Sequence, residues 1–188
     1  SCSLLLLSPL ATAASDSNDK DQVTWFGEVA EGQWLAGVKI GAVKPDNEGF
    51  QDTTSGALVF GYQFARPVGD RGSSSIELEL GTSTWGDVRA GGTTYGEWDI
   101  HSIGVFFNYR SPGTVYFKGK LGVLSTKIHS KSNNGSVTDF DDTGLAFGLG
   151  AGYRLGGNDG NTSIEAEWVS VAGDTDINYY NLGANFEF

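Results

Sequence analysis

Eight segments of this chain alternate apolar residues with polar or small ones, and this period of two constrains the fold more than any other feature. Successive side chains of a β-strand point to opposite faces, so each segment reads as a strand with one apolar face. The last segment, 176–188, places Tyr180, Leu182, Ala184, Phe186 and Phe188 in alternation. The other seven cover residues 33–44, 56–64, 75–82, 99–109, 115–125, 144–155 and 163–170.

The segments fit a membrane better than water. Each has roughly the 9–11 residues with which a tilted strand crosses a bilayer. After the N-terminal region no run of 18 apolar residues follows, and a chain without such helices spans lipid only as a closed barrel. In the water-soluble alternative, a lipocalin-like or sandwich protein, the apolar face points inward and the other face meets solvent. That other face holds many glycines and few charges, which suits the crowded interior of a narrow barrel.

The sequence therefore predicts an all-β fold, an eight-stranded antiparallel up-and-down transmembrane β-barrel. Residues 23–30 alternate more weakly, and a ninth strand would spoil the even number that such barrels have. The connections 65–74, 110–114 and 156–162 are mostly short and turn-like. Those after the first and third segments, and above all 126–142, are longer and polar, so we expect 126–142 to be a long loop. Short turns at one end and long loops at the other are typical of outer-membrane barrels.

The first 32 residues precede the predicted barrel. The chain contains no methionine, so we expect that some N-terminal sequence is missing from it. Four leucines at 4–7, followed by small residues up to Ala14, look like the end of a signal peptide with an A-x-A cleavage site. We expect 1–14 to be a signal-peptide remnant, 15–32 a periplasmic segment and 33–188 the barrel. The one cysteine, Cys2, lies in the remnant, so thiol chemistry is not expected.

Aromatic residues gather at the ends of the predicted strands, where rings of a membrane barrel lie at the two lipid interfaces. The set expected near the short turns is Trp34, Phe64, Tyr109, Phe117, Tyr153, Phe186 and Phe188. The set expected near the long loops is Trp85, Tyr95, Trp98, Trp168, Tyr179 and Tyr180.

The inward faces of the predicted strands carry charges of both signs. We expect a lumen ion-pair network of Lys39, Glu77, Glu79, Lys118, Lys120, Arg154, Glu165 and Glu167. With Glu187, four basic side chains face five acidic ones. An unpaired buried charge costs several kcal/mol, so near-balance is what a packed network requires. Eight strands leave an interior that side chains fill, and the sequence therefore predicts a plugged lumen.

The strands resemble the small eight-stranded outer-membrane barrels of Gram-negative bacteria, of the OmpA transmembrane domain and OmpX type. The resemblance spans about 33–188 and rests on SIELEL at 75–80, GLGAGYRL at 148–155, IEAEW at 164–168 and the terminal Y-x-L-x-A-x-F-x-F. It implies an interior salt-bridge cluster and contact with outer-membrane lipid and lipopolysaccharide. It also implies that the last strand is the signal that the barrel-assembly machinery recognises, through Tyr180, Leu182, Phe186 and Phe188.

Some eight-stranded barrels modify lipid A, which makes the two histidines candidate catalytic residues. His129 loosely resembles the His-x-Ser-Asn motif of lipid A deacylases, but Ser132 comes one residue too late and would project from the opposite face of a strand. His101 shares a face with Asp99, where no serine lies nearby. We therefore predict a rim histidine and a loop histidine, with no catalytic residue.

The acidic residues of the expected loops suggest no bound metal. Asp139, Asp141 and Asp142, or Asp174 and Asp176, offer oxygens that suit calcium or magnesium, but two or three acids are not a ligand set. We therefore expect no metal and no cofactor. A net charge of −11 without a basic patch disfavours nucleic acid as a partner.

We expect a non-enzymatic outer-membrane protein that stabilises the envelope or presents its loops for adhesion to a host or cell-surface ligand. One alternative is a narrow ion or small-solute channel, porin-like, in which the ion-pair network switches partners. A second alternative is a lipid A-modifying enzyme.

Overall fold

The computed structural model describes residues 32–46, 49–64, 72–90, 93–157, 160–173 and 176–188. The expected signal-peptide remnant and all but the last residue of the expected periplasmic segment lie outside these ranges. Every element within them is a strand, and no helix there is long and apolar enough to cross a membrane. The strands are β1 (Gln33–Pro45), β2 (Thr53–Gln63), β3 (Ser73–Ser83), β4 (Gly86–Ala90), β5 (Thr93–Arg110), β6 (Val115–Ser132), β7 (Val137–Leu155), β8 (Thr162–Ala172) and β9 (Ile177–Glu187).

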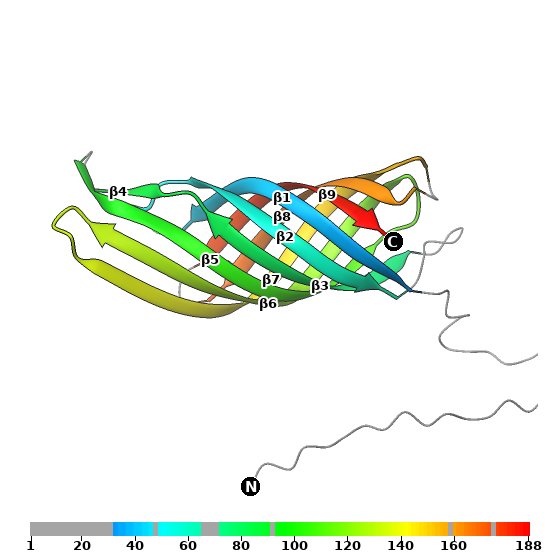
Figure 1. The fold of residues 1–188 in the computed structure, drawn as a ribbon, viewed down its shortest axis with the longest axis horizontal. Coiled ribbons are helices and arrows are strands. Elements are labelled where there is room, and N and C mark those ends of the chain that lie inside the picture. Colours follow the sequence, from blue (N-terminus) through cyan, green and yellow to red (C-terminus); the bar gives the residue numbers. More distant parts are fainter. Residues whose placement is uncertain (1–31, 47–48, 65–71, 91–92, 158–159, 174–175) are drawn as a thin grey trace, which may run out of the picture.

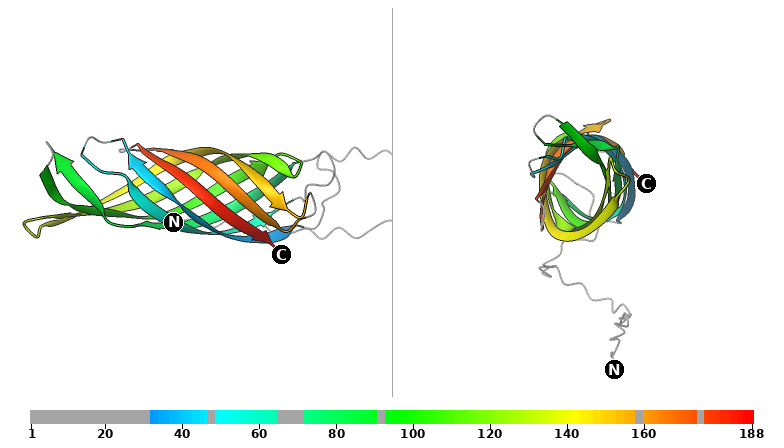
Figure 2. Two further views of the ribbon diagram at one scale, coloured as in Figure 1. Left: turned by 90° about the horizontal axis from the view of Figure 1, so that it is seen from above. Right: turned by 90° about the vertical axis from the view of Figure 1, so that its left-hand side faces the viewer.

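Eight of these strands close into an antiparallel barrel, as the alternation predicts (Figures 1 and 2). Each barrel strand pairs with its neighbours along the chain, β3 pairs with β5, and β9 returns to pair with β1. The closure continues to the last residue, because the backbone of Phe188 exchanges hydrogen bonds of 2.9 and 3.0 Å with Trp34. A closed barrel leaves no open sheet edge in lipid.

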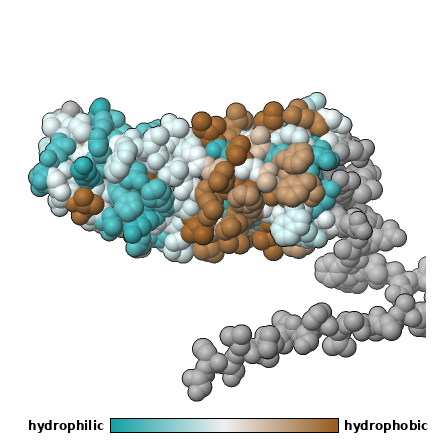
Figure 3. Space-filling view, in the orientation of Figure 1, coloured by the Kyte–Doolittle hydropathy of each residue, from teal (hydrophilic) through white to brown (hydrophobic). Residues whose placement is uncertain are grey.

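The outer surface of the barrel carries the apolar faces of the strands. On β6, Phe117, Leu121 and Val123 point outward and are exposed, whereas Lys118 and Lys120 point inward and are buried. The same parity holds on the other barrel strands, so the exposed apolar residues form a band around the barrel (Figure 3). An outward apolar band over a filled interior is the pattern of a membrane barrel.

The prediction that residues 126–142 form a long loop is wrong. β6 and β7 continue as paired strands to Lys131↔Val137, and β5 pairs with β6 as far as Gly96↔Ser132. Only residues 133–136 join β6 to β7, with Gly135 at a φ of +86°. The polarity of 126–142 indicated a loop, but a strand that lies beyond the lipid needs no apolar face. Cross-strand pairs on both sides of β6 hold these segments as a sheet.

A ninth strand, β4, was also not expected. It pairs with β5 from Gly86↔Trp98 to Ala90↔Thr93 and does not take part in closing the barrel. We call β4 together with residues 93–101 of β5, 127–132 of β6 and 137–143 of β7 the outer sheet. It projects from the end of the barrel opposite the C-terminus (Figure 1) and is more polar than the barrel wall (Figure 3).

Two of the expected interface aromatics point into the barrel instead. Trp98 is fully buried and Tyr179 is 8% exposed. Both lie on the inward face of their strands, together with Ile100 on β5 and Ile177 on β9. Their position near strand ends suggested a lipid interface, but parity decides which face a strand residue occupies.

Candidate functional site

The half of the lumen nearer the C-terminus is filled by charged side chains, which we call the ionic layer. Its four basic and four acidic members are Lys39, Arg110, Lys118, Lys120, Glu77, Glu79, Glu165 and Glu167. All eight are buried. The layer is therefore electrically neutral, which low-dielectric surroundings require.

Two carboxylates organise the end of the ionic layer nearer the C-terminus. Glu165 accepts hydrogen bonds from Arg110 Nε at 2.7 Å, Lys118 Nζ at 2.7 Å and the Tyr116 hydroxyl at 2.8 Å. Glu77 lies 2.8 Å from Arg110 Nη2. Each buried acid thus faces more than one donor, and removing a single partner leaves another charge uncompensated.

The other end of the ionic layer is built around Lys39. Its Nζ lies 2.5 Å from carboxylate oxygens of both Glu79 and Glu167, and Lys120 Nζ lies 2.6 Å from Glu79. Lys118, 3.2 Å from Glu167, joins the two ends. The contacts form one continuous network across strands β1, β3, β5, β6 and β8.

The structure places the predicted lumen residues inside but adds one that sequence reasoning missed. Arg110, expected in a turn, is the last residue of β5 and is 1% exposed. With it, the buried interior charges become five basic against five acidic, since Arg154 and Glu187 also lie inside. The inward position of Arg110 could have been predicted from the alternation along the strand, because Arg110 lies on the same face as Asn108 and Phe106.

Arg154 sits apart from the eight charges of the ionic layer. Its Nη1 donates to the carbonyl of Gly113 at 2.6 Å, and its guanidinium lies 4.4 Å from the ring centroid of Tyr116. Gly152 permits this arrangement, because a Cβ there would come within 2.3 Å of the Tyr116 ring. Arg154 thus anchors the turn between β5 and β6 from inside the lumen.

The opposite half of the lumen is apolar, which the sequence reading did not anticipate. This apolar layer consists of Val43, Trp98, Ile100, Phe106, Leu124, Ala146, Val169, Val171, Ile177 and Tyr179. Phe50 extends it into the outer sheet by packing edge-on against Trp98, with ring centroids 5.4 Å apart. Ten side chains contributed by β1, β5, β6, β7, β8 and β9 therefore pack together in this half of the barrel.

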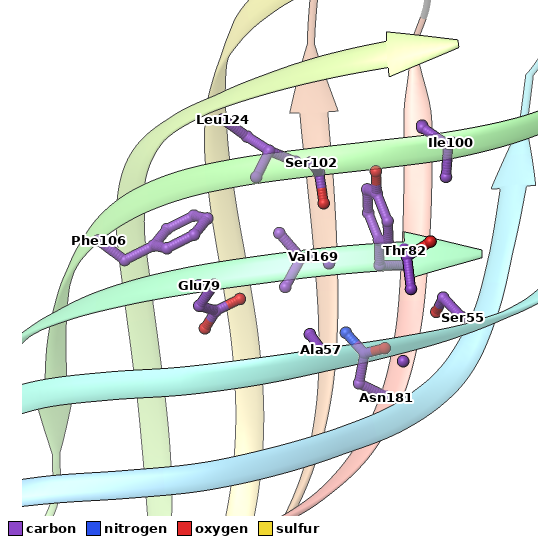
Figure 4. Close-up of a pocket in the computed structure, with 13 residues that line it drawn as sticks. Ser55, Ala57, Glu79, Thr82, Ile100, Ser102, Phe106, Leu124, Val169 and Asn181 are labelled. Atoms are coloured by element: carbon purple, nitrogen blue, oxygen red, sulfur yellow. The ribbon is translucent and has the colours of Figure 1, made fainter. Parts of the chain in front are cut away.

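The two layers meet at Phe106, whose ring centroid lies 3.8 Å from Lys120 Nζ. Beside it is a cavity of about 30 Å³, whose lining includes Glu79, Ser102, Leu124 and Asn181 (Figure 4). This volume accommodates one or two water molecules. Buried side chains thus lie in both halves of the lumen.

The outward face of the outer sheet carries two rows of acidic, histidine and lysine side chains. Asp99 of β5, His129 of β6 and Asp139 of β7 lie side by side, and His129 Nδ1 donates to Asp139 at 2.7 Å. In the next row are His101, Lys127 and Asp141. The rings of His101 and His129 touch, with centroids 5.5 Å apart.

The hydrogen bond from His129 holds the pKa of Asp139 below its ordinary value. The resulting stabilisation is present above the pKa that Asp139 has in the unfolded chain and is lost as the pH falls through the lower pKa of the folded state. In the variant His129→Ala we expect the Asp139 pKa to rise toward its ordinary value. A carboxyl-carbon NMR titration of Asp139 measures this, and an unchanged midpoint would contradict the role given to His129.

The other candidate catalytic residues, His101, Asp99, His129 and Ser132, lie on the outer sheet. His101 lies 3.2 Å from Asp99, and its Nδ1 contacts the Thr82 hydroxyl at 3.1 Å. His129 and Ser132 belong to the same strand, where an odd spacing puts them on opposite faces. Within the described ranges, no group of three or more histidine, cysteine or acidic residues is arranged to hold a metal. Tyr180, Leu182, Phe186 and Phe188 all point outward from the barrel.

Solved structures with a similar fold are small barrels. The attachment invasion locus protein Ail of Yersinia pestis is 18% identical, with 84% of this chain and 97% of that chain covered at a TM-score of 0.55. Neisserial surface protein A is 13% identical, with the same coverage and TM-score. Pseudomonas aeruginosa OprG is 17% identical, with 86% and 98% covered at a TM-score of 0.51. At these identities the likeness extends to the fold alone.

A comparison with curated protein sequences gave no match. The family model described as outer membrane protein beta-barrel domain matches residues 2–188, almost the whole chain. The match agrees with the closed eight-stranded barrel and its outward apolar band. The chain belongs to the outer-membrane β-barrel domain family.

Proposed function

We propose that this protein is a closed, non-enzymatic outer-membrane barrel that presents its outer sheet for binding at the cell surface. One observation carries the proposal: β5, β6 and β7 run for 18, 18 and 19 residues, against 11 for β2, β3, β8 and β9. Their additional residues contribute little to the lipid-facing band, so membrane insertion alone does not account for them.

The outer sheet is suited to display because it is a paired sheet whose inner side packs against the apolar layer of the barrel. Trp98 and Val88 pack with Phe50 on its inner side, and residues 49–51 bond to β4 through Gln51 and Arg89. A binding surface held by strands keeps its shape better than one on a free loop, which lowers the entropy cost of binding. The buried side chains of the ionic and apolar layers support the same proposal, because they occupy the lumen through which a solute would have to pass.

The charge of the outer sheet bears on the class of ligand. The Yersinia pestis protein Ail has been crystallised with the heparin analogue sucrose octasulfate. In this chain the outer sheet contains six acidic residues and three lysines or arginines. Sulfated polysaccharide is repelled by such a surface, so we propose a protein ligand instead.

A shortened variant tests this function. Residues 127–141 are replaced by Asn-Gly, a two-residue hairpin turn flanked by the cross-strand pair Thr126 and Asp142. Cells that display the shortened barrel at equal surface density should lose adhesion to immobilised extracellular proteins that wild-type cells bind. Detergent sensitivity of the two strains should stay equal. Equal adhesion by both strains, or a change in detergent sensitivity alone, would favour an envelope-stabilising role and contradict display.

We also propose that the outward-facing Tyr180, Leu182, Phe186 and Phe188 act as the signal for the barrel-assembly machinery. The support is their exposure on the strand that closes the barrel. Phe188→Ala should reduce the folded protein in the outer membrane of cells while leaving refolding into pure lipid vesicles almost unchanged. Heat-dependent gel mobility measures both quantities. Equal loss in cells and in vesicles would mean that Phe188 acts only on stability.

A further inference from the structure

The outer sheet has one open edge. β7 and β8 pair only from Leu145↔Ala172 toward the other end of the barrel. From Val137 to Asp141, β7 is paired with β6 on one side, and in the described part of the chain no strand pairs with its other side. At the opposite edge of the same sheet, β4 is covered by residues 49–51. Phe50 forms a β-bridge with Val88, Gln51 N donates a hydrogen bond to Asp87 O, and Gly49 O accepts one from Arg89 N.

The backbone groups that face this edge can be identified. Arg154 N donates to Thr114 O, and Ser136 O accepts from Ser132 N, so even-numbered residues of β7 point their backbone groups toward β6. The β6–β7 register is unbroken between these points. Successive residues of an antiparallel strand bond to opposite sides, so Val137, Asp139 and Asp141 direct their N–H and C=O groups to the open edge.

The side chains at the edge define what a further strand should carry. On the outward face, both of the rows described above end in an acid on β7, at Asp139 and at Asp141. On the inward face, the row Ile100, Ile128 and Phe140 ends at Phe140, which is 54% exposed. Opposite charges and apolar pairs across neighbouring strands are stabilising, so a further strand should carry bases outward, opposite the acids, and apolar groups inward, beside Phe140.

We propose that the edge Val137–Asp141 binds an extended segment of another protein in which lysine or arginine alternates with apolar residues. This proposal rests on the display function proposed above. The segment joins the outer sheet as an added strand, through main-chain bonds that give affinity and side-chain pairs that give specificity. The same edge of a second copy of this chain is a poor partner, because pairing the two edges would bring their acids, Asp139 and Asp141, close together. Charges on a strand edge discourage unselective pairing. A partner that neutralises the two acids can also bury the exposed Phe140 between them.

Fluorescent peptides provide the test, with the whole barrel in nanodiscs of zwitterionic phosphatidylcholine so that lipid charge does not attract them. A Lys-Val-Lys-Val-Lys peptide should bind by anisotropy, and a Glu-Val-Glu-Val-Glu peptide should not. A lysine peptide with N-methyl groups on its bonding amides should also fail. Hydrogen exchange at the amides of Val137, Asp139 and Asp141 should slow when the lysine peptide is bound.

Two substitutions at one position separate charge from backbone pairing. Asp139→Asn should weaken binding of the lysine peptide about two- to fivefold, the range of one cross-strand pair. Asp139→Pro also removes the edge N–H and should weaken binding more than about tenfold, while the β6 ladder keeps its bonds. The matched control is Glu97→Gln, which removes the same charge from β5, away from the edge, and should bind like the wild type.

Equal binding of the acidic peptide, wild-type affinity in Asp139→Pro, or unchanged exchange at the three amides would overturn the inference. The outcome is separable from the proposed function. If cells still require the outer sheet for adhesion while no peptide binds this edge, the display function stands and the inference about the edge fails. If adhesion does not require the outer sheet, the display function fails whatever the peptides do.

Discussion

Glu165→Gln should lower the free energy of unfolding by about 3–5 kcal/mol, the cost of breaking a buried ion pair on one side. Glutamine is nearly the same size, so packing changes little. It leaves Arg110 and Lys118 without the carboxylate that each contacts at 2.7 Å, in a site that is 2% exposed. Urea unfolding in phospholipid vesicles, followed by tryptophan fluorescence, measures the difference.

The matched control is Glu97→Gln, the same substitution at an exposed position of the outer sheet. It should stay within about 0.5 kcal/mol of the wild type. The double variant Glu165→Gln with Arg110→Gln should recover part of the loss, because the second change restores equal numbers of basic and acidic side chains in the ionic layer. A loss below 1 kcal/mol in Glu165→Gln would mean that water reaches the ionic layer and screens it.

Leu121→Arg should destabilise the barrel in a bilayer by about 2–4 kcal/mol, the cost of an arginine on the lipid face near the membrane midplane. Leu121 points outward from β6 between Phe107 of β5 and Phe147 of β7. It makes few contacts inside the protein, with 62% of its surface exposed, so the effect must come from lipid. Unfolding in vesicles measures the loss.

Ser125→Arg is the control for Leu121→Arg. Ser125 lies on the same strand and the same parity, four residues nearer the outer sheet. Near the interface an arginine should cost about 0–1 kcal/mol. Equal effects at the two positions would place the lipid band elsewhere on the barrel.

The barrel wall could be predicted from the sequence because the alternation of side chains along a strand fixes which face each residue occupies. A slip of one residue would send every lipid-facing side chain of a strand into the lumen. Alternation therefore placed Leu121 outward and Lys118 and Glu165 inward without any knowledge of their contacts. The same rule could have found Arg110, which was read as part of a turn because Ser111 and Pro112 follow it.

The sequence-based prediction failed at residues whose chemical character suggested a different location from the one they occupy. Trp98 and Tyr179 are aromatic residues near strand ends, typical of a lipid interface, yet they fill the lumen. Residues 126–142 are polar like a loop, yet most of them form strands. Beyond the membrane a strand is held by its neighbours, and which neighbours reach that far depends on the lengths of β5, β6 and β7 together.

The partners within the ionic layer were also beyond the sequence. Parity assigns charges to the interior, but the tilt and stagger of the barrel decide which ones meet. Lys39 on β1 contacts Glu79 on β3 and Glu167 on β8, whereas Arg154 contacts a turn carbonyl and Tyr116. Only the closed barrel brings such distant residues together.

Single-channel recording in planar bilayers tests whether the ionic layer and the apolar layer close the lumen. Insertion is verified on the same sample by the shift in gel mobility between heated and unheated protein. The two layers predict a silent baseline from inserted wild-type barrels. Steady stepwise currents from inserted wild-type barrels, altered by neutralising Lys120 or Arg154, would contradict the closed lumen and favour a channel.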